Sequence, residues 1–102
     1  MDKSNYRLVP VKHFSDELTA MSDTDQKMVG VKLCLLAENP FYPSLRTKKL
    51  NGRFGYYESS VNMNIRIIWE FADDVVSDIY RDANIRIISL LDVGHHDVLK
   101  KY

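Results

Sequence analysis

The sequence predicts one α+β domain over residues 1–102, with the element order β-α-α-β-β-β and two N-terminal helices packed on one face of a small, twisted, mostly antiparallel sheet. Apolar residues at helical spacing are confined to residues 13–38, and strand-like segments follow one another after residue 56 without helices between them. This segregation is typical of α+β rather than α/β folds. The length and the apolar fraction of 45% suit one globular domain.

A short strand and a short helix are expected first. The strand covers Asn5–Val11, a β-branched and aromatic run with a proline near its end. Phe14, Leu18 and Met21 follow at positions i, i+4 and i+7, which is the spacing of the apolar stripe of a helix.

A second helix is expected to begin at Ser22 or Thr24, either of which can cap it, and to run through QKMVGVKLCLLAE. It should end before Pro40, which biases the preceding residue out of the helical region. Because glycine inside a helix costs about 1 kcal/mol relative to alanine, we expect Gly30 to pack closely against the other helix. Cys34 is the one cysteine, so an internal disulfide is excluded and a reducing cytoplasm is the expected location.

Three strands are expected after a basic connector, SLRTKKLNG, at 44–52. They are YYESSV at 56–61, NIRIIWEF at 64–71 and NIRIISLLDV at 84–93. The polar stretch at 72–83 is longer than an ordinary hairpin loop, and it either extends the hairpin or contains a helical turn.

The pentapeptide NIRII occurs twice, and we interpret the repeat as chance recurrence because its neighbours differ. In the first copy, strand alternation places a wholly apolar side toward the helices and Arg66 on the opposite, open face. A hairpin turning near 77–78 would place Arg66 opposite Ser89 and Arg86 opposite Trp69. Arg66 is therefore predicted to share a site with the histidines, and Arg86 to pair with nearby aspartates. The apolar side consists of Ile65, Ile67, Trp69 and Phe71.

The net charge is zero, but the charges are unevenly distributed. Five basic and two acidic residues lie within 41–70, whereas six aspartates and two arginines lie within 71–97. A local basic surface can hold a polyanion, although a neutral molecule is not drawn to nucleic acid at long range. A mixed, solvated surface explains the same pattern. No apolar run approaches a membrane span, and the N-terminus lacks the features of a signal peptide.

The segment GHHDVL at 94–99 contains the residues best suited to proton transfer near neutral pH. Solvated or helix-capping histidines are the plainer interpretation. The basic connector can bind phosphates or simply be solvated, and Glu58 can pair with a lysine, act as a carboxylate base or lie exposed. No metal-ligand spacing, glycine-rich phosphate loop or nucleophile motif is present, so no metal and no cofactor are expected.

The order and spacing of YRLVPVKHF, LLAENPFYPSLRTKKLNG, YYESSV, NIRIIWEF and VGHHDVL resemble the RelE/ParE superfamily of toxins from bacterial toxin–antitoxin pairs. The resemblance covers almost the whole chain. It implies two helices packed on a small twisted sheet, a cognate antitoxin as partner in a hetero-oligomer, and no membrane. Its RelE-like members are endoribonucleases that cut mRNA without a metal, commonly at the ribosome, by activating a ribose 2′-OH to attack the adjacent phosphate.

The resemblance also implies roles for individual residues. Arg66 matches a phosphate-stabilising arginine, and His96 matches a group that acts on the leaving oxygen. Lys49 matches the basic segment that holds the substrate backbone. Glu58 stands where some nucleases of the family have a basic residue, and it joins the expected catalytic set as a candidate carboxylate base. The residues expected to bind RNA are Arg46, Lys48, Arg53, His95 and Tyr102.

Two other functions within the same superfamily remain as alternatives. ParE-like members inhibit DNA gyrase by binding it, without enzymatic activity, and lack the basic and histidine residues noted above. A degenerate member would keep antitoxin binding and lose the nuclease, which the neutral net charge and Ser60, at a place where relatives often have arginine, would accommodate.

Overall fold

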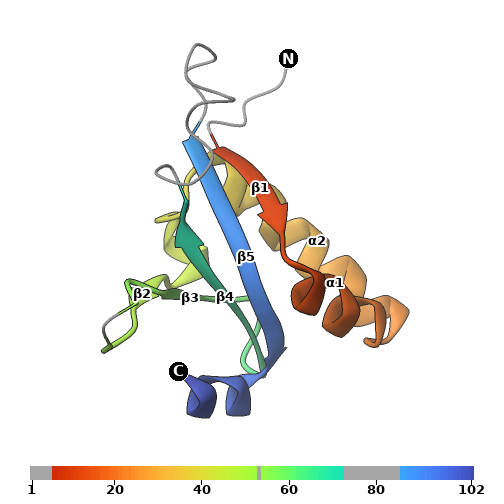
Figure 1. Ribbon diagram of the computed structural model, residues 1–102. Helices are drawn as coiled ribbons and strands as arrows, with labels where there is room; N and C mark the ends of the chain where they lie inside the picture. Colours follow the sequence, from red (N-terminus) through yellow and green to blue (C-terminus); the bar gives the residue numbers. More distant parts are fainter. Residues whose placement is uncertain (1–5, 53, 73–85) are drawn as a thin grey trace.

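A computed structural model describes residues 6–52, 54–72 and 86–102, which form two α-helices and a five-stranded mixed sheet. The α+β class and the order of the predicted elements are confirmed (Figure 1). A two-residue strand within the basic connector was not predicted. The elements are β1 (Tyr6–Pro10), α1 (Lys12–Thr19), α2 (Asp23–Glu38), the 3-10 helix η1 (Pro43–Leu45), β2 (Lys48–Lys49), β3 (Tyr57–Ser60), β4 (Ile65–Phe71), β5 (Arg86–His95) and the 3-10 helix η3 (His96–Lys101).

The sheet has the strand order β1-β5-β4-β3-β2. Strands β2 to β5 pair antiparallel, and β1 joins the edge of β5 in parallel. Helix α1 begins two residues after the end of β1 and lies beside the C-terminal half of β5, where β1 no longer covers that edge (Figure 1).

The predicted register of β4 and β5 is wrong. Arg66 lies opposite Gly94 rather than Ser89, and Trp69 lies opposite Leu90 rather than Arg86. Strand β5 continues to His95, beyond the predicted strand end, and an irregularity between Ile68 and Trp69 shifts the pairing by one residue. The apolar pattern could not fix this register, because β5 is apolar on both sides. The stretch at 72–83 lies, apart from its first residue, outside the described residues.

Local sequence signals set the ends of α2. Ser22 is the N-cap, and its Oγ accepts a hydrogen bond from the backbone N–H of Asp25 at 3.1 Å. Asp23 and Asp25 in the first turn complement the positive end of the helix dipole. Asn39, immediately before Pro40, is extended, so the helix ends at Glu38 as predicted.

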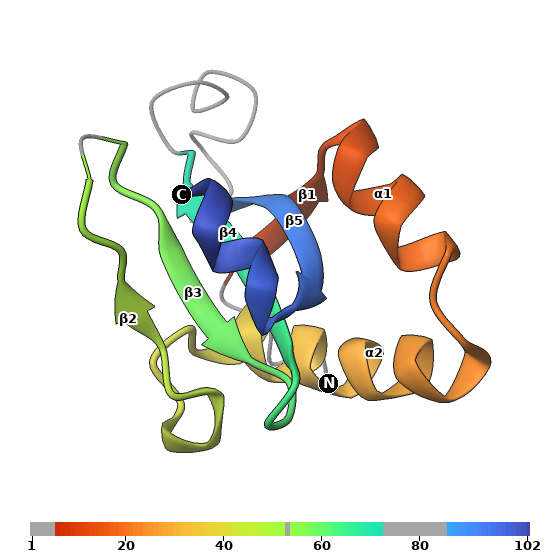
Figure 2. The same cartoon turned by 90° about the horizontal axis from the view of Figure 1, so that it is seen from below.

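The core lies between α2 and the face of the sheet that the sequence assigned to it. Ile65, Ile67 and Trp69 are at most 2% exposed and pack with Val29 and Leu36 from α2. Burying each such side chain contributes about 1.5–3 kcal/mol before entropy costs. The 3-10 helix η3 lies against the opposite face of β4 (Figure 2). Ile68, which strand alternation places on that face, is fully buried.

A chain of hydrogen bonds ties this core to the segment after α2. The indole N–H of Trp69 donates to Ser59 Oγ at 2.9 Å, and Ser59 Oγ lies 2.7 Å from Thr47 Oγ1. The Thr47 hydroxyl donates its proton to the Pro40 carbonyl at 2.6 Å, so Ser59 must donate to Thr47. The polar atoms buried beside Trp69 are thereby satisfied.

No helix within the described ranges is long and apolar enough to cross a membrane.

Gly30 does not make the close helix contact expected from the sequence. It is exposed, and a Cβ placed on it would meet nothing within 4 Å. Gly30→Ala should therefore raise the free energy of unfolding by about 0.5–1 kcal/mol, because alanine loses less backbone entropy in a helix. Urea unfolding should show a higher midpoint at an unchanged m-value.

Gly55 provides the matched control, because its φ of +66° is a backbone conformation that alanine adopts at a cost. Gly55→Ala should lower the free energy of unfolding by about 1 kcal/mol. Destabilisation by Gly30→Ala would contradict the exposed position of this helix face.

Candidate functional site

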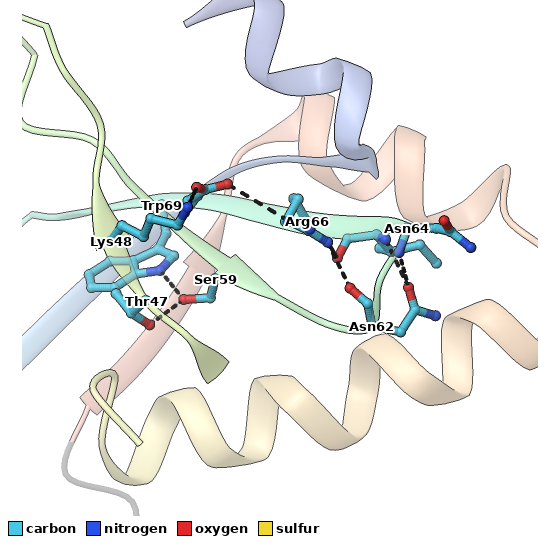
Figure 3. A network of polar contacts seen from close by, with 9 residues as sticks. Thr47, Lys48, Ser59, Asn62, Asn64, Arg66 and Trp69 are labelled. Carbon is cyan, nitrogen blue, oxygen red and sulfur yellow. Dashed lines mark hydrogen bonds and ion pairs between the residues drawn. The ribbon is translucent and has the colours of Figure 1, made fainter. Parts of the chain in front are cut away.

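Three charged side chains from successive strands gather on the face of the sheet opposite α2. Lys48 of β2 lies directly opposite Glu58 of β3, and Arg66 of β4 lies opposite Ser60, one step along the same face. Figure 3 shows Lys48 and Arg66 on the two sides of the carboxylate with which both form ion pairs. The antiparallel registers of β2–β3 and β3–β4 therefore produce a row of cation, carboxylate and cation.

The carboxylate of Glu58 is the buried centre of this row. The residue is 5% exposed, with Oε1 at 3.6 Å from Lys48 Nζ and Oε2 at 3.9 Å from Arg66 Nε. Among the described residues, Oε2 is a buried side-chain oxygen without a hydrogen-bond partner. A buried acceptor left without a donor costs about 1–3 kcal/mol. Such an exception to the usual satisfaction of buried polar groups needs an explanation, and a donor from a bound water molecule or a ligand hydroxyl would provide one.

The turn between β3 and β4 holds Arg66 in place. Asn62 Oδ1 accepts hydrogen bonds from the backbone N–H groups of Asn64 and Ile65, both at 2.8 Å. The Asn62 carbonyl accepts from Arg66 Nη1 at 2.7 Å, and Ile65 contributes a second carbonyl at 3.2 Å (Figure 3). Sequence reasoning missed Asn62, although an asparagine between two strands is a recognisable turn signal.

The remaining basic candidates are placed differently. Lys49 follows Lys48 in β2, so strand alternation turns it to the other side, and its cross-strand neighbour is Tyr57. Lys48, rather than Lys49, therefore lies beside Glu58. Arg46 is exposed at the end of η1, and Arg53 lies outside the described residues.

The two histidines are exposed, and neither contacts the row in the described part of the chain. His95 ends β5 opposite Ile65 and lines a hollow of about 550 Å³ that also contains Asp25 and Asp97. His96 begins η3, with Nε2 at 3.5 Å from Asp97 Oδ1. Gly94 pairs with Arg66 across β4 and β5, which nevertheless keeps this segment next to the row.

A buried aspartate, which sequence reasoning missed, anchors the C-terminus. Asp92 is 1% exposed, and its Oδ2 accepts a hydrogen bond from Tyr102 Oη at 2.9 Å. Its Oδ1 accepts from the N–H of Val93 at 2.9 Å and lies 3.1 Å from His13 Nε2 of α1. An aspartate within an apolar strand was the available signal, but its partners come from opposite ends of the chain. Burial of the hydroxyl and the adjacent Asp92 carboxylate raise the pKa of Tyr102 to about 12.

No set of three or more histidine, cysteine, aspartate and glutamate side chains among the described residues is arranged to hold a metal ion.

Comparisons with known proteins identify the fold. No protein-family model and no curated protein match the sequence. Among solved structures, YafQ from E. coli matches with a TM-score of 0.67 and 15% identity, over 92% of this chain and 97% of its own. The archaeal RelE–RelB complex from Pyrococcus horikoshii OT3 matches with a TM-score of 0.66 and 16% identity, over 89% and 94%. The intact E. coli RelBE toxin–antitoxin complex matches with a TM-score of 0.62 and 19% identity, over 87% and 94%. The chain thus has the same fold as these RelE and YafQ structures.

The contact between Tyr102 and Asp92 predicts a stability change with a defined pH dependence. Tyr102→Phe should lower the free energy of unfolding by about 1 kcal/mol at pH 8, because it removes a hydrogen bond to a buried carboxylate. The neutral phenol is the donor, so its contribution is complete below its ordinary pKa of 10.0 and is lost as the pH rises through about 12. Denaturant unfolding of both proteins at several pH values checks this. The gap between them should narrow above pH 10, and a constant gap would contradict the assignment.

Proposed function

We propose that this chain is the toxin of a toxin–antitoxin pair and cleaves RNA at the row formed by Lys48, Glu58 and Arg66. The observation that carries the proposal is the unpartnered Oε2 of Glu58, buried beside two cations on the face of the sheet opposite α2. A single-stranded RNA offers the two groups that such a row would bind, a hydroxyl donor and an adjacent phosphate anion.

In this mechanism, Glu58 Oε2 accepts the proton of a ribose 2′-OH, and the 2′-oxygen attacks the neighbouring phosphorus. Arg66 holds the negative charge that develops on the phosphate oxygens, and Lys48 adds a second, more mobile cation. The bond from phosphorus to the 5′-oxygen breaks, leaving a 2′,3′-cyclic phosphate and a 5′-hydroxyl. A positioned acid or base contributes about 10²–10⁴-fold in rate, and a charge-stabilising donor about 10²–10³-fold.

We assign to His96 the donation of a proton to the 5′-oxygen. His96 lies two residues after Gly94, and Gly94 is opposite Arg66 in the sheet. Its imidazole side chain is 66% exposed and so accessible to a bound substrate. His95, Lys49, Arg46, Arg53 and Tyr102 stay as candidates for RNA contacts. Of these, Tyr102 already donates its hydroxyl to Asp92, which limits it to contacts through its ring.

The substrate and partners belong to the same proposal. The substrate is mRNA, at the ribosome or free, in the cytoplasm, and no metal ion or other cofactor is required. A cognate antitoxin would silence the toxin by covering the Arg66 face in a hetero-oligomer. Support comes from the fold, which is shared with solved toxin–antitoxin complexes.

Glu58→Gln should lower RNA cleavage by about 10²–10⁴-fold, because an amide cannot accept the 2′-OH proton. Arg66→Gln should lower it by about 10²–10³-fold. Purified proteins are assayed on RNA alone and on programmed ribosomes, with unfolding curves to show that each variant is folded. Glu70→Gln, the same change at the end of β4, is the control and should retain activity.

Full activity in Glu58→Gln would overturn the base assignment. If the wild-type protein left RNA intact under both conditions but inhibited supercoiling by gyrase, the ParE-like alternative would replace the nuclease. Antitoxin binding without either activity would identify a degenerate member.

His96→Ala should lower kcat and abolish the basic limb of the pH–rate profile, because a protonated imidazole is the proposed proton donor. The matched change His95→Ala should alter KM more than kcat. Steady-state cleavage from pH 5 to 9 separates these effects, and an unchanged kcat and pH profile in His96→Ala would remove that residue from the mechanism.

A further inference from the structure

A second polar hollow, of about 340 Å³, opens next to the proposed catalytic row. Arg66 belongs to both features. The opposite wall comes from the segment around η1 and carries Arg46 and Ser44, and the β3–β4 turn contributes Ser60, Asn62 and Met63. The lining contains two guanidinium groups and two hydroxyls, and it contains no carboxylate.

The backbone of Arg46 is held in an unusual conformation at this hollow. Its φ of 48° and ψ of 44° are left-handed, which non-glycine residues rarely adopt, and its N–H donates to the Pro43 carbonyl to close η1. A left-handed residue is a common way for a helix to end, and at this position it places Arg46 in the lining of the hollow. Among the described residues, the guanidinium of Arg46 has no hydrogen-bond or ion-pair partner, so it is available to an anion.

Arg66 connects the hollow to the row through its separate nitrogens. Nη1 is held by the Asn62 and Ile65 carbonyls, and Nε faces Glu58. Nη2 has no hydrogen-bond partner in the described part of the chain. One planar guanidinium can therefore contact a phosphate at the row and still contribute positive potential to the hollow.

We propose that this hollow binds a second phosphate of the RNA, one nucleotide from the phosphate that is cleaved. Arg46 forms the charged contact, and the hydroxyls of Ser44 and Ser60 are additional donors to its oxygens. Met63, which is 87% exposed at the rim, supplies an apolar surface for the adjoining nucleoside. The inference rests on the proposed function and adds to it that the substrate needs at least two consecutive phosphates.

The test measures binding without cleavage. Fluorescence anisotropy follows a labelled 2′-O-methyl RNA, which has no attacking hydroxyl, at several salt concentrations. Arg46→Gly removes the guanidinium, and glycine accepts the left-handed backbone without strain. The dissociation constant should rise about tenfold. The plot of log association constant against log salt concentration should become less steep, its slope losing about 0.7 in magnitude, which is the value for one phosphate contact on a single strand. Lys12→Gln, an equal loss of charge on α1, should change neither quantity.

A second comparison uses two short 2′-O-methyl ligands, a dinucleotide with one phosphate and a trinucleotide with two. Arg46→Gly should weaken binding of the trinucleotide and leave the dinucleotide unaffected. If Arg46→Gly leaves the affinity for RNA and its salt dependence unchanged while the wild-type protein cleaves RNA, the second phosphate site is overturned and the proposed function stands. An equal loss of affinity for a polyglutamate peptide would overturn the assignment to phosphate. A wild-type protein that neither binds nor cleaves RNA would overturn both.

Discussion

The tight turn between β3 and β4 fixes the register on which the whole site depends. Asn62 closes this turn with two hydrogen bonds to backbone N–H groups, and its carbonyl holds Arg66. Because side chains alternate along a strand, a slip of one residue would send Glu58 into the core and Ser59 onto the opposite face. Ser59 is also tied to Trp69 from the core side, so packing and turn geometry enforce the same pairing.

The burial of the Glu58 carboxylate lowers stability, and the proposed function would explain why the residue is there. Burying a charge is costly unless its oxygens are satisfied, and two cations at 3.6 and 3.9 Å offset only part of that cost. Asp92, on the same face of the sheet, is equally buried but has donors on both oxygens, from Tyr102 and Val93. One carboxylate thus has donors on both oxygens, whereas the other has one oxygen without a hydrogen-bond donor among the described residues.

The sequence predicted the fold class, the helices, the core face of β4 and the outward position of Arg66, because these follow from local periodicity and capping. It did not predict the β4–β5 register, because β5 is apolar on both faces. The one-residue shift in pairing after Ile68 also has no recognisable signature in the sequence. The burial of Glu58 and the partners of Asp92 were also missed. Both depend on contacts between segments far apart in the chain, which no local pattern encodes.

The chemistry at the fragment ends tests the central claim most directly, because attack by a 2′-oxygen leaves a characteristic product. Mass spectrometry of RNA cut by the wild-type protein in the presence of a metal chelator should find 2′,3′-cyclic phosphate or its 3′-phosphate hydrolysis product on one side of the cut and a 5′-hydroxyl on the other. Fragments with 5′-phosphate ends, or cutting at a linkage whose attacking ribose is 2′-deoxy, would contradict the role given to Glu58.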